Sequence, residues 1–396
     1  MSPARRARSA VTAIFLLNGI VYGSWAARIP AIRDRLGLSD GELGIALVFI
    51  PIGSIVAMPL AGALAARTGS RRATRGAFAL MCAVTIVVAL APSLVALSAL
   101  LLVFGMGMGS LDVGMNVHGV TVEREYGRPI FSGFHAAFSF GGLAGAALGA
   151  LAAHGGLDVR VHLALVGVLC AAVGLTWSRR FLPGSADAIA EHDPVFVRPP
   201  RTLWALGALA FACLLIEGAS ADWSGVYIKD ELGAGAGFAA LGFTAFSVTM
   251  TLGRLVGDGL VVRFGSVRLV RLGGLVAGVG FGTALAVSAP AAALVGFACL
   301  GAGMSSVIPI VFRAAGQAPG IASSVSLSAV TSIGYLGFVA GPPAIGGIAE
   351  LVGLPNALAV LVLLAALVAA LARTTAPAGA PAEAGPAEGD REAVAA

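Results

Sequence analysis

Charge is scarce in this sequence. Of its 396 residues only 11% are Asp, Glu, Lys or Arg, whereas 58% are hydrophobic, and the mean hydropathy is +0.93. Soluble domains carry about 25% charged residues, so this chain cannot cover its surface with charge and we expect lipid to be its solvent. The net charge of +5 does not indicate nucleic-acid binding, because the arginines are spread over short loops between apolar runs.

Paired cysteines and phosphate-binding motifs are lacking as well. The four cysteines fall inside apolar runs without paired spacing, which excludes a disulfide framework and a cysteine metal site. No Walker-type glycine loop occurs, so ATP is excluded as the energy source. We therefore expect no enzyme activity, no cofactor and no metal site. The cysteines are Cys82, Cys170, Cys213 and Cys299.

Long apolar runs dominate the sequence instead. A membrane-spanning helix needs about 20 mostly apolar residues, and twelve runs meet that need. They predict an all-α membrane protein with twelve transmembrane helices. The runs cover residues 10–28, 41–66, 75–92, 95–122, 130–153, 159–178, 202–228, 237–262, 267–288, 290–312, 321–348 and 354–373.

The distribution of basic residues predicts the orientation. With the N-terminus in the cytoplasm, 19 of the 25 basic residues fall in cytoplasmic segments, five fall in outer segments and one, Arg254, lies inside a span. An excess of Lys and Arg marks cytoplasmic loops. We therefore expect a multi-pass protein of the bacterial cytoplasmic membrane with both termini inside.

The sequence repeats itself at a spacing of 196 residues. Like-charged residues and glycines recur at matching places in four pairs of segments. Two similar halves in a bilayer are the construction of secondary transporters, in which one half rocks against the other around a central site. The pairs are 33–37 with 229–233, 67–70 with 263–266, 105–108 with 301–304, and Gly141 and Gly145 with Gly337 and Gly341.

The repeat divides the chain into four parts. Residues 1–178 and 202–375 are each expected to form a six-helix bundle. The polar residues 179–201 predict a cytoplasmic linker between the bundles. Residues 376–396 are rich in Ala, Pro, Gly and Glu and predict a disordered cytoplasmic tail. We expect the protein to be a monomer.

The loop after the second apolar run carries a family resemblance. Residues 62–72 (GALAARTGSRR) are similar to the Gly-x-Leu-x-Asp-Arg-x-Gly-Arg-Arg loop of the major facilitator superfamily. The resemblance covers nearly the whole chain and implies two pseudo-symmetric six-helix bundles. It also implies a cytoplasmic gate in which Arg67, Arg71 and, in the second copy, Arg263 take part. The aspartate of that loop is Ala66 here.

Two charged residues precede the second copy of this loop. Arg254 and Asp258 are four residues apart in the eighth span, so their spacing predicts an ion pair within one helix. A structural or gating role is favoured over contact with substrate.

A second resemblance is narrower. Residues 111–116 (LDVGMN) resemble the Leu-Glu-Thr-Ala-Ala-Asn stretch of fucose-permease-like sugar–proton symporters. The resemblance implies that Asp112 takes part in proton coupling. The acidic residue that those symporters carry in the first span is Ala26 here, and the repeat spacing maps Ala26 onto Asp222.

Few carboxylates lie at membrane depth, and each is a candidate for function. A charged side chain there costs about 2.5–3.5 kcal/mol on insertion scales. Asp112, Glu217 and Asp222 are the candidates for proton coupling. The alternative for Asp112 is a carboxylate locked structurally to a neighbouring helix. Asp222 is equally open to contact with substrate and to an outer-interface anchor paired with Arg28. His135 is a further candidate as a proton relay, against the alternative of a packed histidine.

Polar and aromatic residues in the spans are candidates for substrate binding. Tyr and Trp combine a ring face with a polar tip, which suits sugars and amphipathic ligands. Anchoring at the membrane interface is the alternative for each aromatic residue. The candidates are Asn18, Tyr22 and Trp25 on one stripe of the first span, with Asn116, Trp223, Tyr227 and Tyr335.

Together these observations predict a secondary active transporter that works by alternating access. Proton-coupled symport of a small polar organic solute such as a sugar is the first choice. Proton-coupled efflux of amphipathic compounds is the alternative, and a non-transporting membrane receptor or scaffold is a second one. The expected partners are a small-molecule substrate, protons and the lipid bilayer.

Overall fold

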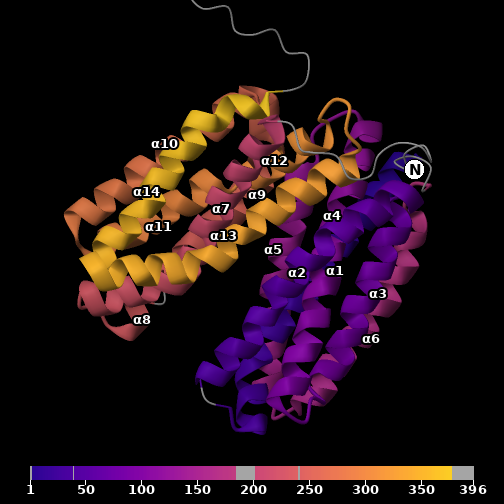
Figure 1. Cartoon of the computed structure of the whole chain (residues 1–396), viewed down its shortest axis with the longest axis horizontal. Coiled ribbons are helices and arrows are strands. Elements are labelled where there is room, and N and C mark those ends of the chain that lie inside the picture. The colour runs from indigo at the N-terminus through magenta and orange to yellow at the C-terminus, as the bar shows by residue number, and fades with distance from the viewer. Residues whose placement is uncertain (1, 39, 184–200, 240, 377–396) are drawn as a thin grey trace, which may run out of the picture.

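The computed structural model describes residues 2–38, 40–183, 201–239 and 241–376 (Figure 1). Within these ranges the chain forms helices joined by turns and contains no strand, which confirms the all-α prediction. Most of the predicted linker and nearly all of the predicted tail lie outside the described residues.

The first half of the chain forms one bundle of six long helices. A one-turn 3-10 helix, Ser178–Arg180, follows the last of them. The six are α1 (Pro3–Leu36), α2 (Asp40–Thr68), α3 (Ser70–Val88), α4 (Leu94–Tyr126), α5 (Phe131–His154) and α6 (Val159–Trp177).

The second half forms a matching bundle in which some elements are subdivided. One turn of π-helix, Tyr227–Glu231, extends the first helix, and Ala372–Thr375 form a final 3-10 turn. The helices are α7 (Arg201–Val226), α8 (Ala236–Ala239), α9 (Leu241–Phe264), α10 (Ser266–Val287), α11 (Pro290–Met304), α12 (Val307–Gly316), α13 (Ser323–Val352) and α14 (Leu354–Leu371).

Eleven helical segments among the described residues are long and apolar enough to cross a membrane. The remaining predicted span, residues 75–92, corresponds to α3. The first two turns of α3 carry Arg71, Arg72 and Arg75. These arginines shorten its apolar part. Because α3 packs against both α4 and α6, it is nevertheless a full member of the first bundle.

The same pairs of helices pack together in both bundles. α1 packs on α5 as α7 packs on α13, α2 packs on α4 as α9 packs on α11, and α3 packs on α6 as α10 packs on α14. Each pair in the first half therefore has its counterpart in the second, as the 196-residue repeat predicts.

Glycines of the repeat set the closest approaches. A Cβ atom at Gly105 of α4 would collide with the carbonyl oxygen of Ile50 in α2. A Cβ atom at Gly301 of α11 would likewise collide with the carbonyl oxygen of Phe246 in α9. Residues 50 and 246 differ by 196, as do 105 and 301. Small residues that let backbones touch are the usual glue between membrane helices, so both halves use the same contact.

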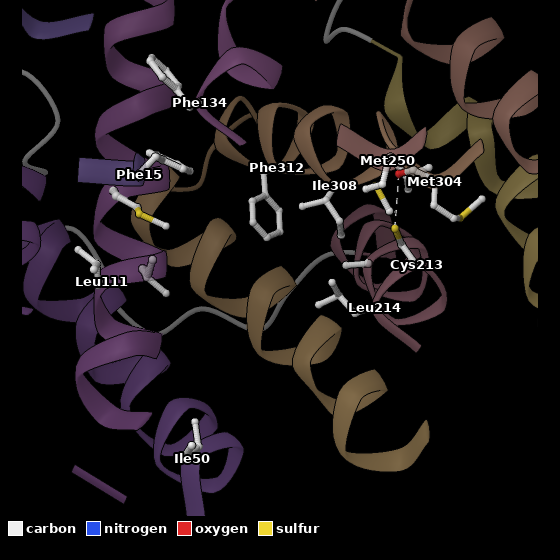
Figure 2. Close-up of a cluster of buried hydrophobic side chains, with 14 of the residues drawn as sticks. Phe15, Ile50, Leu111, Phe134, Cys213, Leu214, Met250, Met304, Ile308 and Phe312 are labelled. Atoms are coloured by element: carbon white, nitrogen blue, oxygen red, sulfur yellow. Dashed lines mark hydrogen bonds between the residues drawn. The ribbon is translucent and has the colours of Figure 1, made fainter. Parts of the chain in front are cut away.

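The tenth predicted span, residues 290–312, is confirmed as the membrane-crossing segment Pro290–Gly316, but two helices, α11 and α12, make it up. The chain leaves the helix at Ser305 and Ser306, between α11 and α12. Pro309 has no N–H to bond the carbonyl of Ser305, and its ring crowds that carbonyl. The Met304 carbonyl beside the break accepts a hydrogen bond from the Cys213 thiol of α7 at 3.7 Å, drawn as the dashed line in Figure 2.

The two bundles are inclined to each other like the arms of a V (Figure 1). They meet on the side where α1 begins and α14 ends, which we call the terminus side. On the opposite side, where the α1–α2 connection and α8 lie, they diverge. The contacts between bundles run from α2 and α4 to α13, from α5 to α9, and from α12 to α4 and α5.

Candidate functional site

A ring of charges joins the bundles on the terminus side. The guanidinium of Arg313, at the end of α12, donates through Nε and Nη2 to the Glu123 carboxylate at the end of α4. The Nη2–Asp258 Oδ1 distance is 3.6 Å, so Arg313 stands between a carboxylate of each bundle. The Arg313 and Glu123 side chains are only 12% and 7% exposed. Buried charges need this kind of pairing.

Both carboxylates also cap the same helix. Glu123 Oε2 accepts hydrogen bonds from the backbone N–H groups of Ile130 and Phe131 at 2.8 and 2.9 Å, where α5 begins. Asp258, from the other bundle, accepts from the N–H groups of Ser132 and Gly133 at 3.0 and 2.9 Å. Helix N-termini leave such groups without partners and favour negative charge. The start of α5 is therefore held by both halves at once.

A second polar connection lies deeper in the molecule. Arg254 of α9 lies 3.6 Å from the Glu217 carboxylate of α7 and donates to the Ser139 hydroxyl of α5 at 2.9 Å. Arg254 is 7% exposed. The predicted ion pair between Arg254 and Asp258 within one helix is wrong, because each side chain has its partners on other helices.

Helices α2 and α13 make the third contact between the two bundles. The Ser328 hydroxyl donates to the Met58 carbonyl at 2.7 Å, and Gly62 leaves no room for a Cβ beside Ser328. The Ser328 hydroxyl thus joins the two halves.

An aromatic cluster fills the space beside these polar contacts. The His135 ring of α5 lies 5.3 Å from Phe15, 5.4 Å from Phe131 and 6.1 Å from Phe312 of α12, centroid to centroid. Figure 2 shows Phe312 between the first-bundle residues Phe15 and Leu111 and the second-bundle residue Ile308. His135 is 8% exposed, and no contact in the described structure joins it to Asp112. The surroundings of His135 are those of the packed-histidine alternative. The role of His135 as a proton relay stays a prediction.

Asp112 lies where the two halves face each other. Asn116, one turn along α4, donates from Nδ2 to Asp112 Oδ1 at 2.9 Å. The phenol of Tyr335, on α13 of the other bundle, lies close enough to influence the ionisation of the same carboxyl group. Among the described residues, no Lys or Arg forms an ion pair with Asp112, so it can take up a proton without breaking one.

Tyr335 connects Asp112 to further polar groups. Its ionisation is also influenced by Tyr22 of α1 and Glu217 of α7, and that of Tyr22 by Glu217 and Asp222. Tyr22 is 41% exposed. We call Asp112, Tyr335, Tyr22, Glu217 and Asp222 the central group.

Some predicted substrate contacts lie elsewhere. Trp25 is 2% exposed and packs 6.0 Å from the Phe104 ring, and Tyr227 is 1% exposed. Both lie inside their own bundles, so the prediction that they face the substrate is wrong for this conformation. Asn18 is buried and donates to Met115 Sδ at 3.8 Å, and Trp223 packs over Gly346. The roles of these two stay predictions.

The predicted gate arginines also lie outside the charge ring. Arg67 and Arg263 are exposed, and within the described structure neither forms an ion pair. Arg71 donates to the Arg179 carbonyl at 3.3 Å, within its own bundle. Glu123 and Arg313 were not among the predicted gate residues. In the sequence these two residues are marked only by their position, because each charged residue lies at the end of an apolar span next to a short loop.

Arg28 and His118 both have structural partners. Arg28 donates to the Leu157 carbonyl at 2.6 Å, so it does not anchor Asp222. His118 Nδ1 lies 2.7 Å from the Ser70 hydroxyl, and Nε2 accepts from the N–H of Leu182 at 3.2 Å. His118 thus ties the end of the first bundle to the chain that leaves it.

Comparison with known proteins identifies the family. The Major Facilitator Superfamily model matches residues 10–325, and the chain belongs to that family of membrane transporters. An uncharacterised MFS-type transporter of Yersinia pestis is 37% identical over 351 residues, 88% of this chain and 91% of the relative.

Solved structures show the same fold. The fucose:proton symporter FucP of Escherichia coli matches with a TM-score of 0.75 at 17% identity, over 93% of this chain and 98% of FucP. The human organic anion transporter MFSD10 matches with a TM-score of 0.75 at 17% identity, over 94% of this chain and all of MFSD10. The predicted fold of twelve helices in two bundles is confirmed.

Proposed function

We propose that this transporter is a proton-coupled symporter of a small polar organic solute, working by alternating access across the bacterial cytoplasmic membrane. The observation that carries the proposal is the setting of Asp112. A carboxyl group that is hydrogen-bonded to Asn116 of its own bundle and influenced by Tyr335 of the other, without a described cationic partner, can couple its protonation to the relative position of the halves.

The resemblance to FucP supports the same reading. That protein is a fucose:proton symporter, and its structure superposes over nearly the whole chain. The convergence of Tyr22, Asn116 and Tyr335 near Asp112 favours a hydroxylated solute over an amphipathic drug, because these side chains offer hydrogen bonds as well as ring faces. MFSD10 transports organic anions, but three carboxylates in the central group disfavour an anion here.

The reconstituted transporter should use a pH gradient to accumulate its solute. Proteoliposomes with a more acidic exterior are tested with labelled L-fucose and D-glucosamine, and a gradient of one unit supports about tenfold accumulation for one proton per solute. A protonophore should abolish it. Uptake that is indifferent to both the gradient and the protonophore would refute proton coupling. Export of amphipathic dyes driven by the same gradient would support the efflux alternative.

The orientation can be tested separately. Most basic residues lie in the loops of the terminus side, so we propose that this side is cytoplasmic and that the described conformation is open to the outside. A protease-cleavable tag at either terminus should be protected in intact spheroplasts and cleaved after lysis. Cleavage in intact spheroplasts would reverse both assignments. A cleavable site inserted between α1 and α2 is the control and should already be cleaved in intact spheroplasts.

A further inference from the structure

Arginines gather where α3 begins and α6 ends, on the terminus side. Helix α3 packs along α6, and Nη2 of Arg71 donates to the Arg179 carbonyl, in the 3-10 turn after α6, at 3.3 Å. Arg72 and Arg75 lie in the first two turns of α3, and Arg180 follows Arg179. Five positive charges therefore lie at one end of this pair of helices. We call these five residues the arginine cluster.

The arginine cluster has no negative partner in the part of the chain that the structure describes. None of its five members takes part in an ion pair there. Residues 43–111 and 159–183 contain no Asp or Glu, so neither helix of the pair supplies a carboxylate. Like charges at short range repel one another. The cluster is thus complementary to a ligand that carries several negative charges.

Exposed apolar side chains continue from the arginine cluster along both helices. On α6, Leu165, Leu169 and Val173 follow one another at steps of four residues and are 50%, 60% and 47% exposed. Trp177 completes this stripe at the arginine end, and Leu80 is exposed on α3. Figure 1 shows α3 and α6 on the side of the first bundle that faces away from the second. An apolar surface of this kind is a site of contact with the membrane.

Trp177 lies where the apolar stripe meets the arginine cluster. The guanidinium carbon of Arg180 lies 4.2 Å from the centroid of the Trp177 ring, which is within cation–π range. The membrane-crossing segment of α6 ends at Arg180. Tryptophan side chains concentrate at the depth of the lipid headgroups. The cluster and the stripe therefore match the two parts of an anionic lipid, the headgroup and the acyl chains.

A general excess of positive charge in cytoplasmic loops does not account for the whole cluster. Arg72 and Arg75 have arginines at the equivalent places of α10, as that excess favours in both halves. The other three arginines have uncharged counterparts, and the counterpart of the tryptophan is not aromatic. Arg71, Arg179 and Arg180 correspond to Val267, Thr375 and Ala376, and Trp177 corresponds to Arg373. Three arginines and a tryptophan are thus particular to the first bundle.

We infer that the arginine cluster binds cardiolipin, a phospholipid with two phosphate groups and four acyl chains. The arginines of α3 bind one phosphate, Arg179 and Arg180 bind the other, and the chains lie along the exposed faces of α3 and α6. Arginine suits phosphate because its planar fork can donate two parallel hydrogen bonds. Basic pockets between helices at the membrane surface are typical of cardiolipin sites. The inference concerns a lipid and not the transported solute, so it is independent of the proposed function.

Native mass spectrometry of the purified, delipidated full-length chain measures the binding directly. Cardiolipin, phosphatidylglycerol and phosphatidylethanolamine are titrated separately. Each arginine near an anionic lipid contributes about a fivefold gain in affinity. We expect cardiolipin to bind more tightly than phosphatidylglycerol, which has one phosphate. Phosphatidylethanolamine, which has no net charge, should bind about a hundredfold more weakly than cardiolipin.

Variants assign the binding to residues. Arg71→Gln combined with Arg179→Gln and Arg180→Gln should weaken cardiolipin binding about a hundredfold, because three charges are lost. The double variant Arg179→Gln with Arg180→Gln keeps the Arg71 contact with the Arg179 carbonyl and should weaken binding about twentyfold. Trp177→Leu keeps every charge, so a smaller loss is expected. A melting temperature close to that of the unaltered lipid-free protein checks that each variant is folded.

The matched control removes three charges from the same side of the second bundle. It combines Arg268→Gln, Arg271→Gln and Arg373→Gln, and it should bind cardiolipin as the unaltered protein does. An equal loss in the control and in the site variant would show that only net charge matters and would overturn the inference. Equal binding of cardiolipin and either other lipid would overturn it too. Cardiolipin that binds only after the acidic residues of the predicted linker are replaced by amides would assign the arginines to that segment instead.

Discussion

Asp112→Asn is expected to abolish accumulation driven by a pH gradient while leaving downhill exchange of the solute intact. Asparagine keeps the shape of the side chain but cannot gain or lose a proton. The hydrogen bond from Asn116 to the carboxyl group can be kept to the amide oxygen. At a gradient of one unit the accumulation ratio should fall from about ten to about one. Counterflow in proteoliposomes with equal pH on both sides measures the exchange that should survive.

Two controls keep this result specific. Asp158→Asn removes an exposed carboxylate that caps α6 and binds Arg160, far from the central group, and should accumulate solute normally. Tyr335→Phe removes the hydroxyl group that the second bundle brings near Asp112 but leaves Asp112, so coupling should be weakened rather than lost. Full accumulation by Asp112→Asn would show that another group carries the proton.

Arg313→Ala is expected to open the terminus side. Without the guanidinium, Glu123 and Asp258 would approach the same helix start as two unneutralised negative charges. Removing one partner of a buried ion pair costs about 3–5 kcal/mol. Under the proposed alternating access the bundles separate there in the other conformation, so this cost shifts the conformational equilibrium. A shift of about 3 kcal/mol changes the ratio of the two conformations roughly a hundredfold.

Spin-label distances across the terminus side can measure this shift. Arg72 of α3 and Arg268 of α10 are exposed, lie on this side and are equivalent in the repeat, so Arg72→Cys and Arg268→Cys provide the pair. Cys299→Ser removes the one native cysteine that is not buried. Arg313→Ala should populate a longer distance that is nearly absent from the unaltered protein.

Arg67→Ala is the matched control for that measurement. The resemblance of its loop to the family's conserved loop predicted a gate at Arg67, but the side chain is exposed and lies outside the charge ring. We therefore expect the distance distribution of Arg67→Ala to match that of the unaltered protein. A distribution unchanged in Arg313→Ala but altered in Arg67→Ala would return the gate to the conserved loop.

Much of the fold could be predicted from the chain alone, because lipid imposes simple rules. Backbone groups in a bilayer must be satisfied within a helix, so each apolar run becomes a span. The repeat predicted equivalent packing, and Gly105 and Gly301 make equivalent contacts with Ile50 and Phe246. The break at Ser305 and Ser306 was missed, since an apolar run does not reveal where a proline interrupts it.

The candidate site could be predicted only in part. Asp112, Glu217 and Asp222 were recognisable because carboxylates at membrane depth are costly and therefore rare. Tyr22, Asn116 and Tyr335 were named for their chemistry, and the structure places them beside these carboxylates. Trp25 and Tyr227 were named for the same chemistry but point into their bundles. Helical spacing alone does not say which stripe faces the other half.

The sequence by itself determined the solvent, the number of spans and the twofold construction of this transporter, because hydropathy and a constant repeat spacing are properties of the chain. Only the tertiary structure decided which charges meet. Glu123 and Arg313 are 190 residues apart, and Arg254 and Asp258, neighbours on one helix, bind different partners. Ion pairs form where folded helices bring charges within a few ångströms, and the packing of two bundles, rather than distance along the chain, determines that proximity.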